Sequence, residues 1–132
     1  MAALHFEFVS PESVLFSGDV DQVDLPGSEG DMGILPGHAP LVTTLRPGIV
    51  TIFRGSQREP VVVIGGFAEV SPVGLTVLAD RAVARENFDM ALLADKIKDT
   101  EEDVADAKDD AERDKLARHL EQLKSLQAAL AS

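Results

Sequence analysis

The 132-residue chain contains no cysteine, which excludes disulfide bridges, thiol nucleophiles and cysteine-based zinc sites. The absence of cysteine also fits a reducing compartment. The longest apolar run, VVVIGGFA, is less than half of the roughly 20 residues that a membrane helix needs. The first residues, MAALHFEFV, lack the basic region and the long apolar core of a signal peptide. We therefore expect neither direct membrane insertion nor a cleaved leader.

Glycine and proline are absent from residues 75–132, although the chain has ten glycines and seven prolines before that point. Lysine shows the opposite distribution, since the first lysine is Lys96. A composition shift this sharp predicts an architectural boundary between residues 80 and 87. The sequence therefore predicts two domains, 1–85 and 86–132.

Positive charge is scarce throughout the chain, whose formal net charge is −11. Residues 1–84 carry 4 Arg against 10 acidic residues, and residues 85–132 carry 8 Lys and Arg against 13. Binding to phosphate backbones or anionic lipids requires clustered Lys and Arg. The charge pattern therefore argues against nucleic acid and against a lipid surface as a direct partner.

The glycine-containing part reads as β-structure. Short runs rich in Val, Ile, Thr and Phe recur between turn residues: LHFEFV, SVLFSG, VDQVDLPG, LVTTLRPG, IVTIFRGS, PVVVIGG, FAEVSPVG and LTVLAD. Eight or more short strands at spacings of about ten residues indicate a β-sandwich or barrel. No helical pattern separates the strands, so we do not expect a parallel sheet.

The second part reads as two helices. Leu93, Ile97, Thr100, Val104, Ala107 and Ala111 keep a three-four spacing, and Leu116, Leu120, Leu123, Gln127 and Leu130 keep another. The two stripes differ in phase by two residues, about 200° on a helix, which predicts a turn near residues 108–110. Asp109 and Glu112 can form a capping box there, and Asn87 can cap the first helix. We expect an antiparallel helix hairpin that is only marginally stable, because its first stripe is thinly apolar. From the residues alone, a fixed hairpin and a hairpin whose helices another partner can capture both stay open.

The stretch PGSEGDMGILPGHAPLV, residues 26–42, concentrates glycine and proline. Its glycines suit either a phosphate cradle or the turns of a sheet protein. The stretch has no lysine, and Glu29 and Asp31 would repel phosphate, so we interpret the glycines as turn residues. Met32, Ile34 and Leu35 either tuck under the sandwich or are exposed for a partner. A backbone this constrained makes a good recognition surface, since little entropy is lost on docking.

No catalytic or metal-binding residues are expected. The three histidines, His5, His38 and His119, fall in a strand, a loop and a helix. No serine sits in a nucleophile elbow. The carboxylates of DTEEDVADAKDD have the spacing of a solvated helix face and lack the glycine of a calcium loop.

Three longer motifs carry a family resemblance. They are SPESVLFSGDVDQVDLPGSEGDMGILPGHAPLVTTLRPG, then GGFAEVSPVGLTVLAD, and then the helical tail without glycine or proline. Together they closely resemble the epsilon subunits of bacterial F-type ATP synthases, whose mitochondrial counterpart is called delta. The resemblance covers nearly the whole chain. It implies a mainly β fold with an added α part, namely an N-terminal β-sandwich of ten strands followed by an antiparallel two-helix hairpin.

The resemblance also implies a function. Members of the family are non-catalytic rotor subunits in the central stalk, where they couple rotation of the proton-driven c-subunit ring to the gamma subunit. By resemblance Asp31 faces the c-ring, with Glu29 and Met32 as neighbours, and Ser10 and His38 lie toward gamma. The implied location is the cytoplasmic face of a bacterial inner (plasma) membrane, peripheral through the complex.

The helical tail has a second role in the family. In several members the hairpin opens, inserts between gamma and the alpha and beta subunits, and blocks ATP hydrolysis. Some members bind ATP through the motif L/I-D-x-x-R-A, where this chain reads FDMALL. Asp89 is retained, but Leu92 and Leu93 replace the arginine and the alanine, which removes the natural phosphate contact. We expect no cofactor, and Asp89 binds one only if this degenerate motif works.

Two other readings of the chain stay open from the residues alone. It could be an unrelated β-sandwich adaptor with a helical arm, which would not co-purify with an ATPase. It could also be a small hydrolase that uses paired carboxylates, which would show turnover by the isolated chain.

Overall fold

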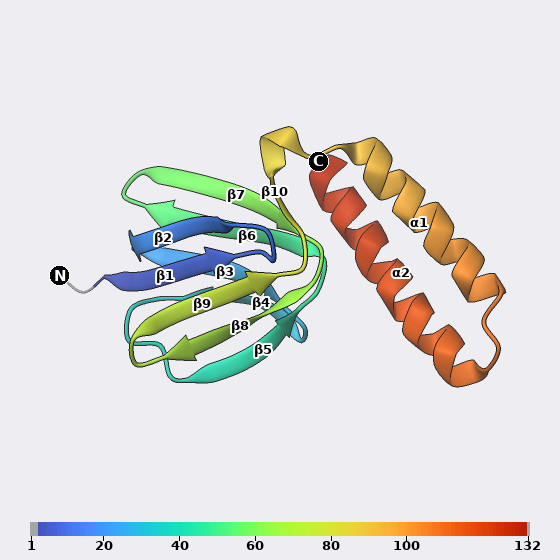
Figure 1. Ribbon diagram of the computed structural model, residues 1–132, viewed down its shortest axis with the longest axis horizontal. Helices are drawn as coiled ribbons and strands as arrows, with labels where there is room; N and C mark the ends of the chain where they lie inside the picture. Colours follow the sequence, from blue (N-terminus) through green and yellow to red (C-terminus); the bar gives the residue numbers. More distant parts are fainter. Residues whose placement is uncertain (1–2, 132) are drawn as a thin grey trace. The chain divides into compact units, whose positions relative to one another are not determined.

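The structure is a computed structural model that describes residues 3–131, and it divides into two compact units, Met1–Asn87 and Phe88–Ser132. Figure 1 shows a β-sheet unit, which precedes a pair of helices in the chain. Each unit is described by itself below.

The first unit is built from ten short strands. They are β1 (Leu4–Val9), β2 (Val14–Val20), β3 (Gln22–Gly27), β4 (Gly30–Ile34), β5 (Leu41–Leu45), β6 (Gly48–Arg54), β7 (Gln57–Val63), β8 (Gly66–Ser71), β9 (Gly74–Ala79) and β10 (Ala82–Ala84). The expected β-sandwich of about ten strands is confirmed. Two of the strands, β4 and β10, were not among the eight runs recognised in the sequence.

The strands form one curled sheet in the order β10-β7-β6-β3-β5-β8-β9-β1-β2, and β4 pairs with β3 beside this path. Every pair is antiparallel except β1 with β9, which is parallel. The sheet as a whole is antiparallel, in line with the expectation that it would not be a parallel sheet, and among residues 3–131 the β1–β9 pair is its one exception. Parallel neighbours need a long crossover connection, and here the intervening strands of the sheet supply it in place of a helix.

Alternation along the strands builds the core. Phe6 and Phe8 are fully buried, and their ring centroids lie 5.6 Å apart. The intervening Glu7 is only half-buried, as expected for a strand with one inward face. The buried apolar core comprises Leu4, Phe6, Phe8, Val20, Val23, Leu25, Ile34, Leu45, Val50, Ile52, Val63, Ala68, Val70, Leu75, Val77 and Ala79.

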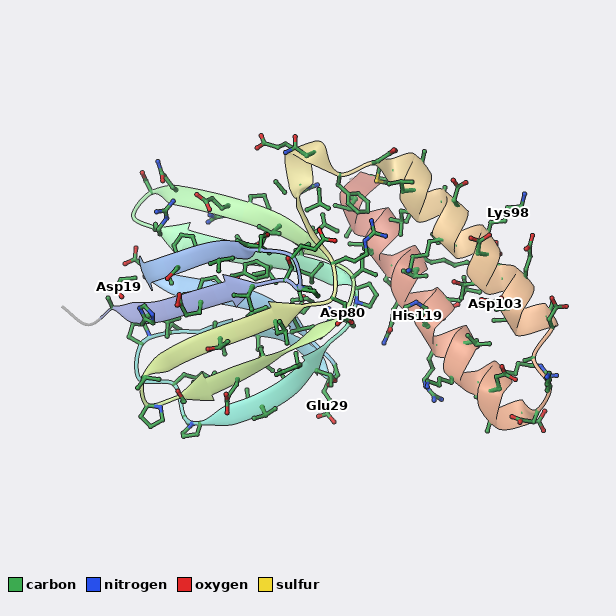
Figure 2. The ribbon with its side chains drawn as sticks, viewed as in Figure 1. Asp19, Glu29, Asp80, Lys98, Asp103 and His119 are labelled. Carbon is green, nitrogen blue, oxygen red and sulfur yellow. The ribbon has the colours of Figure 1, made fainter. Side chains whose placement is uncertain are left out.

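Strand register divides the turns of the sheet between two ends. Gly27 pairs with Leu45, Leu45 with Gly66, and Gly66 with Ala79, so this row marks one end, which we call the Glu29 end. At the other end of the strands His5 pairs with Asp19, and we call this the Asp19 end. Figure 2 shows Glu29 and Asp80 at one end of the sheet and Asp19 at the other.

The second unit is a hairpin of α1 (Met90–Ala105) and α2 (Asp110–Ala131), preceded by the 3₁₀ turn η1 (Arg85–Asn87). Figure 1 shows the two helices running antiparallel, as the sequence predicted. The buried side chains of this unit are Leu93, Ile97, Thr100, Leu123 and Leu126. All but Leu126 belong to the two predicted stripes.

The helix ends correct one expectation and confirm another. Asn87 lies in the 3₁₀ turn and does not cap α1. Asp89 is the cap, because its backbone is extended and its carboxylate accepts a hydrogen bond of 2.9 Å from the N–H of Ala91. At α2 the carboxylate of Asp109 accepts from the N–H of Glu112 at 2.7 Å, as predicted.

Candidate functional site

The glycine-rich stretch forms the β3–β4 hairpin. Gly27 and Gly30 are the last paired residues, and Ser28 and Glu29 make the turn between them. A Cβ on Gly27 would lie 2.8 Å from the carbonyl oxygen of Gly30, and Gly30 has a positive φ of 144°. Both positions therefore require glycine. The glycines are turn residues of a sheet, as we interpreted them.

The apolar residues of the stretch divide between the two alternatives left open by the sequence. Ile34 is fully buried in the core, and Met32 is half-buried against it. Leu35, in contrast, is 53% exposed. Met32 and Ile34 therefore anchor β4 to the core, whereas Leu35, the residue that follows the strand, faces solvent.

Arg46 contacts this hairpin from the turn between β5 and β6. Its Nη1 donates to the carbonyl oxygen of Gly27 at 2.5 Å, and its Nη2 forms an ion pair with the Asp31 carboxylate. Its backbone N–H donates to the carbonyl oxygen of Pro26 at 3.0 Å. Figure 2 shows Glu29 projecting from the end of the sheet. Within residues 3–131 the Glu29 carboxylate makes no hydrogen bond or ion pair.

Ser10 follows β1 at the Glu29 end of the sheet. Its backbone N–H donates to the carbonyl oxygen of Ser13 at 2.9 Å, which fixes a tight turn between β1 and β2. It borders an open depression of about 400 Å³ that Asp80 and Arg81 also line. Ser10 therefore shares this end of the sheet with Glu29 and Asp31.

His38 lies at the Asp19 end instead. Its backbone N–H donates to the carbonyl oxygen of Leu35 at 3.1 Å, and its Nδ1 lies 2.8 Å from the carbonyl oxygen of Ala39. It lines an open depression of about 280 Å³ with His5 and Asp19. The six-residue strand β1 separates it from Ser10, about 20 Å at 3.3 Å per residue. The structure does not bring Ser10 and His38 together.

Metal ligands do not cluster in the part of the chain that the structure describes. No three His, Asp or Glu side chains there are close enough to hold an ion. His5 contacts Asp19 at 3.3 Å and Glu7 at 3.8 Å, which makes a small surface network of one histidine and two carboxylates. The arrangement can attract or orient a polar partner.

Asp89 and its neighbours have structural roles in the helical unit. The Asp89 carboxylate is engaged in capping α1. Leu92 is 57% exposed, and Leu93 is buried. The side chains that replace the arginine and alanine of the ATP motif thus lie on different sides of the helix.

His119 of α2 is the one residue of residues 3–131 whose pKa clearly departs from its ordinary value. Burial lowers the pKa of His119, and the nearby Lys96 charge on α1 lowers it further. A hydrogen bond with Gln122 opposes these effects. The hairpin therefore favours the neutral imidazole.

Sequence reasoning missed Arg46. It falls in the run LVTTLRPG, which predicts a strand and no ion pair, although a signal is present, because Arg46 is the first Lys or Arg in the chain. A lone cation at the end of a strand, downstream of an acidic hairpin, is a candidate ion-pair partner for that hairpin.

The helices of residues 3–131 are all too short or too polar to cross a membrane.

Comparisons with known proteins give a consistent result. Residues 3–85 match the family described as ATP synthase, Delta/Epsilon chain, beta-sandwich domain. ATP synthase epsilon chain 1 of Nitrobacter hamburgensis is 52% identical over 130 residues, which cover 98% of this chain and 96% of that protein. The ATP synthase epsilon chain of Afipia carboxidovorans is 46% identical over 132 residues, covering 100% and 97%.

Solved structures agree with these relatives. A chain in the mitochondrial ATP synthase of Euglena gracilis, solved as OSCP/F1/c-ring, matches with a TM-score of 0.77 and 28% identity over 98% of this chain and 82% of that one. A chain of the Tetrahymena thermophila central stalk and c-ring matches in fold alone, with a TM-score of 0.70 and 11% identity over 98% and 96%. The family model matches the β-sandwich, and the relatives match this chain over almost its full length. The chain therefore belongs to the delta/epsilon chain family of ATP synthase.

Proposed function

We propose that the chain is the rotor subunit of the central stalk of an F-type proton-translocating ATP synthase and couples rotation of the c-subunit ring to the gamma subunit. The observation that carries this proposal is the match, over almost the full length of both chains, to relatives called ATP synthase epsilon chain. The Euglena complex, whose matching chain was solved together with F1 and a c-ring, supports the same assembly.

The β3–β4 hairpin is the proposed contact with the c-ring. Glu29 and Asp31 are both exposed at the end of the sheet, and Met32 beneath them packs on the core. A rigid acidic tip suits the polar, basic loops that we expect on the ring, because charge pairing steers assembly and fixes its register.

Ser10 and His38 are the proposed contacts with gamma. Because they lie at opposite ends of β1, one partner has to extend along the strand, about 20 Å, to contact both. An elongated partner such as a long helix meets this requirement, since about 13 residues of helix cover the same length.

The subunit itself is proposed to be non-catalytic and to bind no cofactor. Its proposed location is the cytoplasmic face of the bacterial inner membrane, held there through the complex. The bacterial origin of the two epsilon chain relatives described above supports this location. The adaptor alternative is not favoured, because it leaves the family membership without explanation.

The helical unit, residues 86–132 in the proposed division, is a regulatory arm. We expect it to contact the alpha and beta subunits only when the hairpin opens. The thin apolar seam of α1, where Thr100 is among the three buried residues, supports an arm that can open.

The division is tested by deleting residues 86–132. The truncated chain is expected to bind a complex stripped of this subunit as tightly as the full chain does and to restore ATP-driven proton pumping, because the proposed rotor contacts all lie in the sandwich. Pumping is followed by quenching of a pH-sensitive dye in reconstituted vesicles. Loss of binding by the truncated chain would contradict the division into coupling and regulatory parts.

Restored pumping is also the test of the main proposal. The stripped complex should hydrolyse ATP without moving protons, and adding the full chain should recouple the two. A stripped complex that pumps normally would show that the subunit does not transmit rotation.

A further inference from the structure

The β3–β4 tip is held by a single arginine that reaches it from another part of the sheet. The Arg46 guanidinium bonds the Gly27 carbonyl on β3 and the Asp31 carboxylate on β4, so it bridges both strands just below the turn. A planar guanidinium suits this task because its N–H donors point in fixed, divergent directions. The backbone N–H of Ser28 adds a bond of 3.0 Å to the Thr44 carbonyl oxygen of β5.

The two members of the ion pair differ in how they are held. The Arg46 side chain is 28% exposed, whereas the Asp31 side chain is 81% exposed. The less exposed partner, Arg46, is therefore the more firmly held one, and Asp31 pairs with it. An ion pair of this kind compensates the charge of Asp31 within the subunit itself.

Glu29 carries the negative charge of the hairpin tip that Arg46 does not compensate. It sits in the turn, is exposed, and has no hydrogen bond or ion pair among residues 3–131. The three side chains Glu29, Asp31 and Arg46 sum to one negative charge, which is located on Glu29. Because the field of a compensated pair falls off faster than that of a lone charge, and salt screens both within about 8 Å, an approaching cation responds mainly to Glu29.

We propose that Arg46 is a positioning residue that clamps the hairpin tip, and that Glu29 rather than Asp31 presents the contact charge to a cationic loop surface. This inference rests on the proposed function, which places that surface on the c-ring. Asp31 acts through Arg46 by keeping the turn in one conformation.

The decisive variant is Arg46→Met, which keeps an unbranched stem and removes both charge and donors. If only charge mattered, this variant would bind a cationic surface more tightly, because it makes the tip more negative. The clamp predicts the opposite change in affinity. Binding should weaken about three-fold to ten-fold, since the freed turn has to be ordered on docking. Binding is measured by titrating the labelled full chain into the ATP synthase complex stripped of this subunit.

Matched controls separate the roles. Arg54→Met makes the same charge change at the Asp19 end, where Arg54 pairs with Glu59 at 2.7 Å, and should leave binding unchanged. Glu29→Gln should weaken binding about two-fold to five-fold and flatten its salt dependence, as removal of one exposed charge contact does. Amide exchange at Ser28 should accelerate in Arg46→Met and stay unchanged in Glu29→Gln. Should Arg46→Met fail to fold, Arg46→Gln, which removes the charge and keeps an amide NH2 group, gives the same contrast.

The outcomes are distinguishable. Unchanged or tighter binding by Arg46→Met, together with weaker binding by Glu29→Gln, would overturn the clamp and leave the c-ring contact standing. Unchanged binding by Glu29→Gln with weaker binding by Arg46→Met would overturn the assignment of the contact charge. If neither variant changes binding, the tip does not contact the ring and that part of the proposed function fails.

Discussion

Replacing Leu123 with alanine tests whether burial of a few apolar side chains is what closes the helical hairpin. Leu123 is fully buried, and it belongs to the small set of buried apolar side chains on the two helices. The ion pair between Lys124 and Glu101, at 3.8 Å and about half exposed on both sides, contributes about 1 kcal/mol or less. Closure of the hairpin therefore depends on apolar packing.

The expected loss is large relative to what holds the hairpin. A fully buried leucine contributes about 1.5–3 kcal/mol by burial, and its replacement by alanine leaves a cavity, so the total loss is about 2–5 kcal/mol. Four buried apolar side chains, Leu93, Ile97, Leu123 and Leu126, are described in this unit. We expect Leu123→Ala to leave the hairpin predominantly open at 25 °C while the sandwich stays folded.

Because the chain contains no cysteine, introduced cysteines are its only sites for thiol-specific labels. A Glu101→Cys/Lys124→Cys background gives two label sites whose parent side chains are 3.8 Å apart in the closed hairpin. Two spin labels at these sites report a short distance when the hairpin is closed and a broad, longer distribution when it is open. In Leu123→Ala the long distances should dominate.

Leu92→Ala is the matched control. This leucine lies on α1 and is 57% exposed, so its loss should leave the label distances unchanged. A closed hairpin in Leu123→Ala, with the same distances and the same helix melting temperature as the parent, would refute the reasoning from burial.

Two further predictions concern pH and backbone packing. The pKa of His119 is lowered in the folded hairpin, so the unfolded state binds more protons. Hairpin stability should therefore fall as pH decreases through and below 6.5, the ordinary pKa of histidine. Helix melting followed by circular dichroism between pH 7.5 and 5 checks this, and His119→Leu should flatten the pH dependence. Gly66→Ala should destabilise the sandwich by about 1–3 kcal/mol in urea unfolding, because the new Cβ would lie 2.2 Å from the Leu78 carbonyl oxygen. Gly55→Ala also places alanine at a positive φ, of 59°, but has open space around it, so it should lose less.

The architecture could be predicted from the sequence because its strongest signals are local. Alternation of Phe6 and Phe8 with polar neighbours, and the phase slip between the two helical stripes, depend only on residues close in the chain. The two missed strands show the limit of this approach. β4 contains two glycines and an aspartate, and β10 has only three residues, so neither carries a pattern long enough to recognise.

The site was less predictable, since it depends on contacts between distant residues. The pairing of Arg46 with Asp31 joins positions 15 residues apart. The separation of Ser10 from His38 follows from strand register, which depends on side-chain packing across the whole sheet. The capping error at Asn87 has a local cause: two polar residues, Asn87 and Asp89, both suit the position, and only the start of α1 decides between them.

The parallel pairing of β1 with β9 has a consequence for how the protein is made. Phe6 pairs with Leu75, so the first strand to leave the ribosome has to wait for nearly the last strand of its domain before its place in the sheet is complete. A chain emerging at about 5–20 residues per second is held in this unfinished state for several seconds. Until β9 emerges, β1 has only one hydrogen-bonded neighbour, β2, and its other edge stays unpaired, which makes nascent chains the stage most exposed to strand misassembly and to chaperone binding.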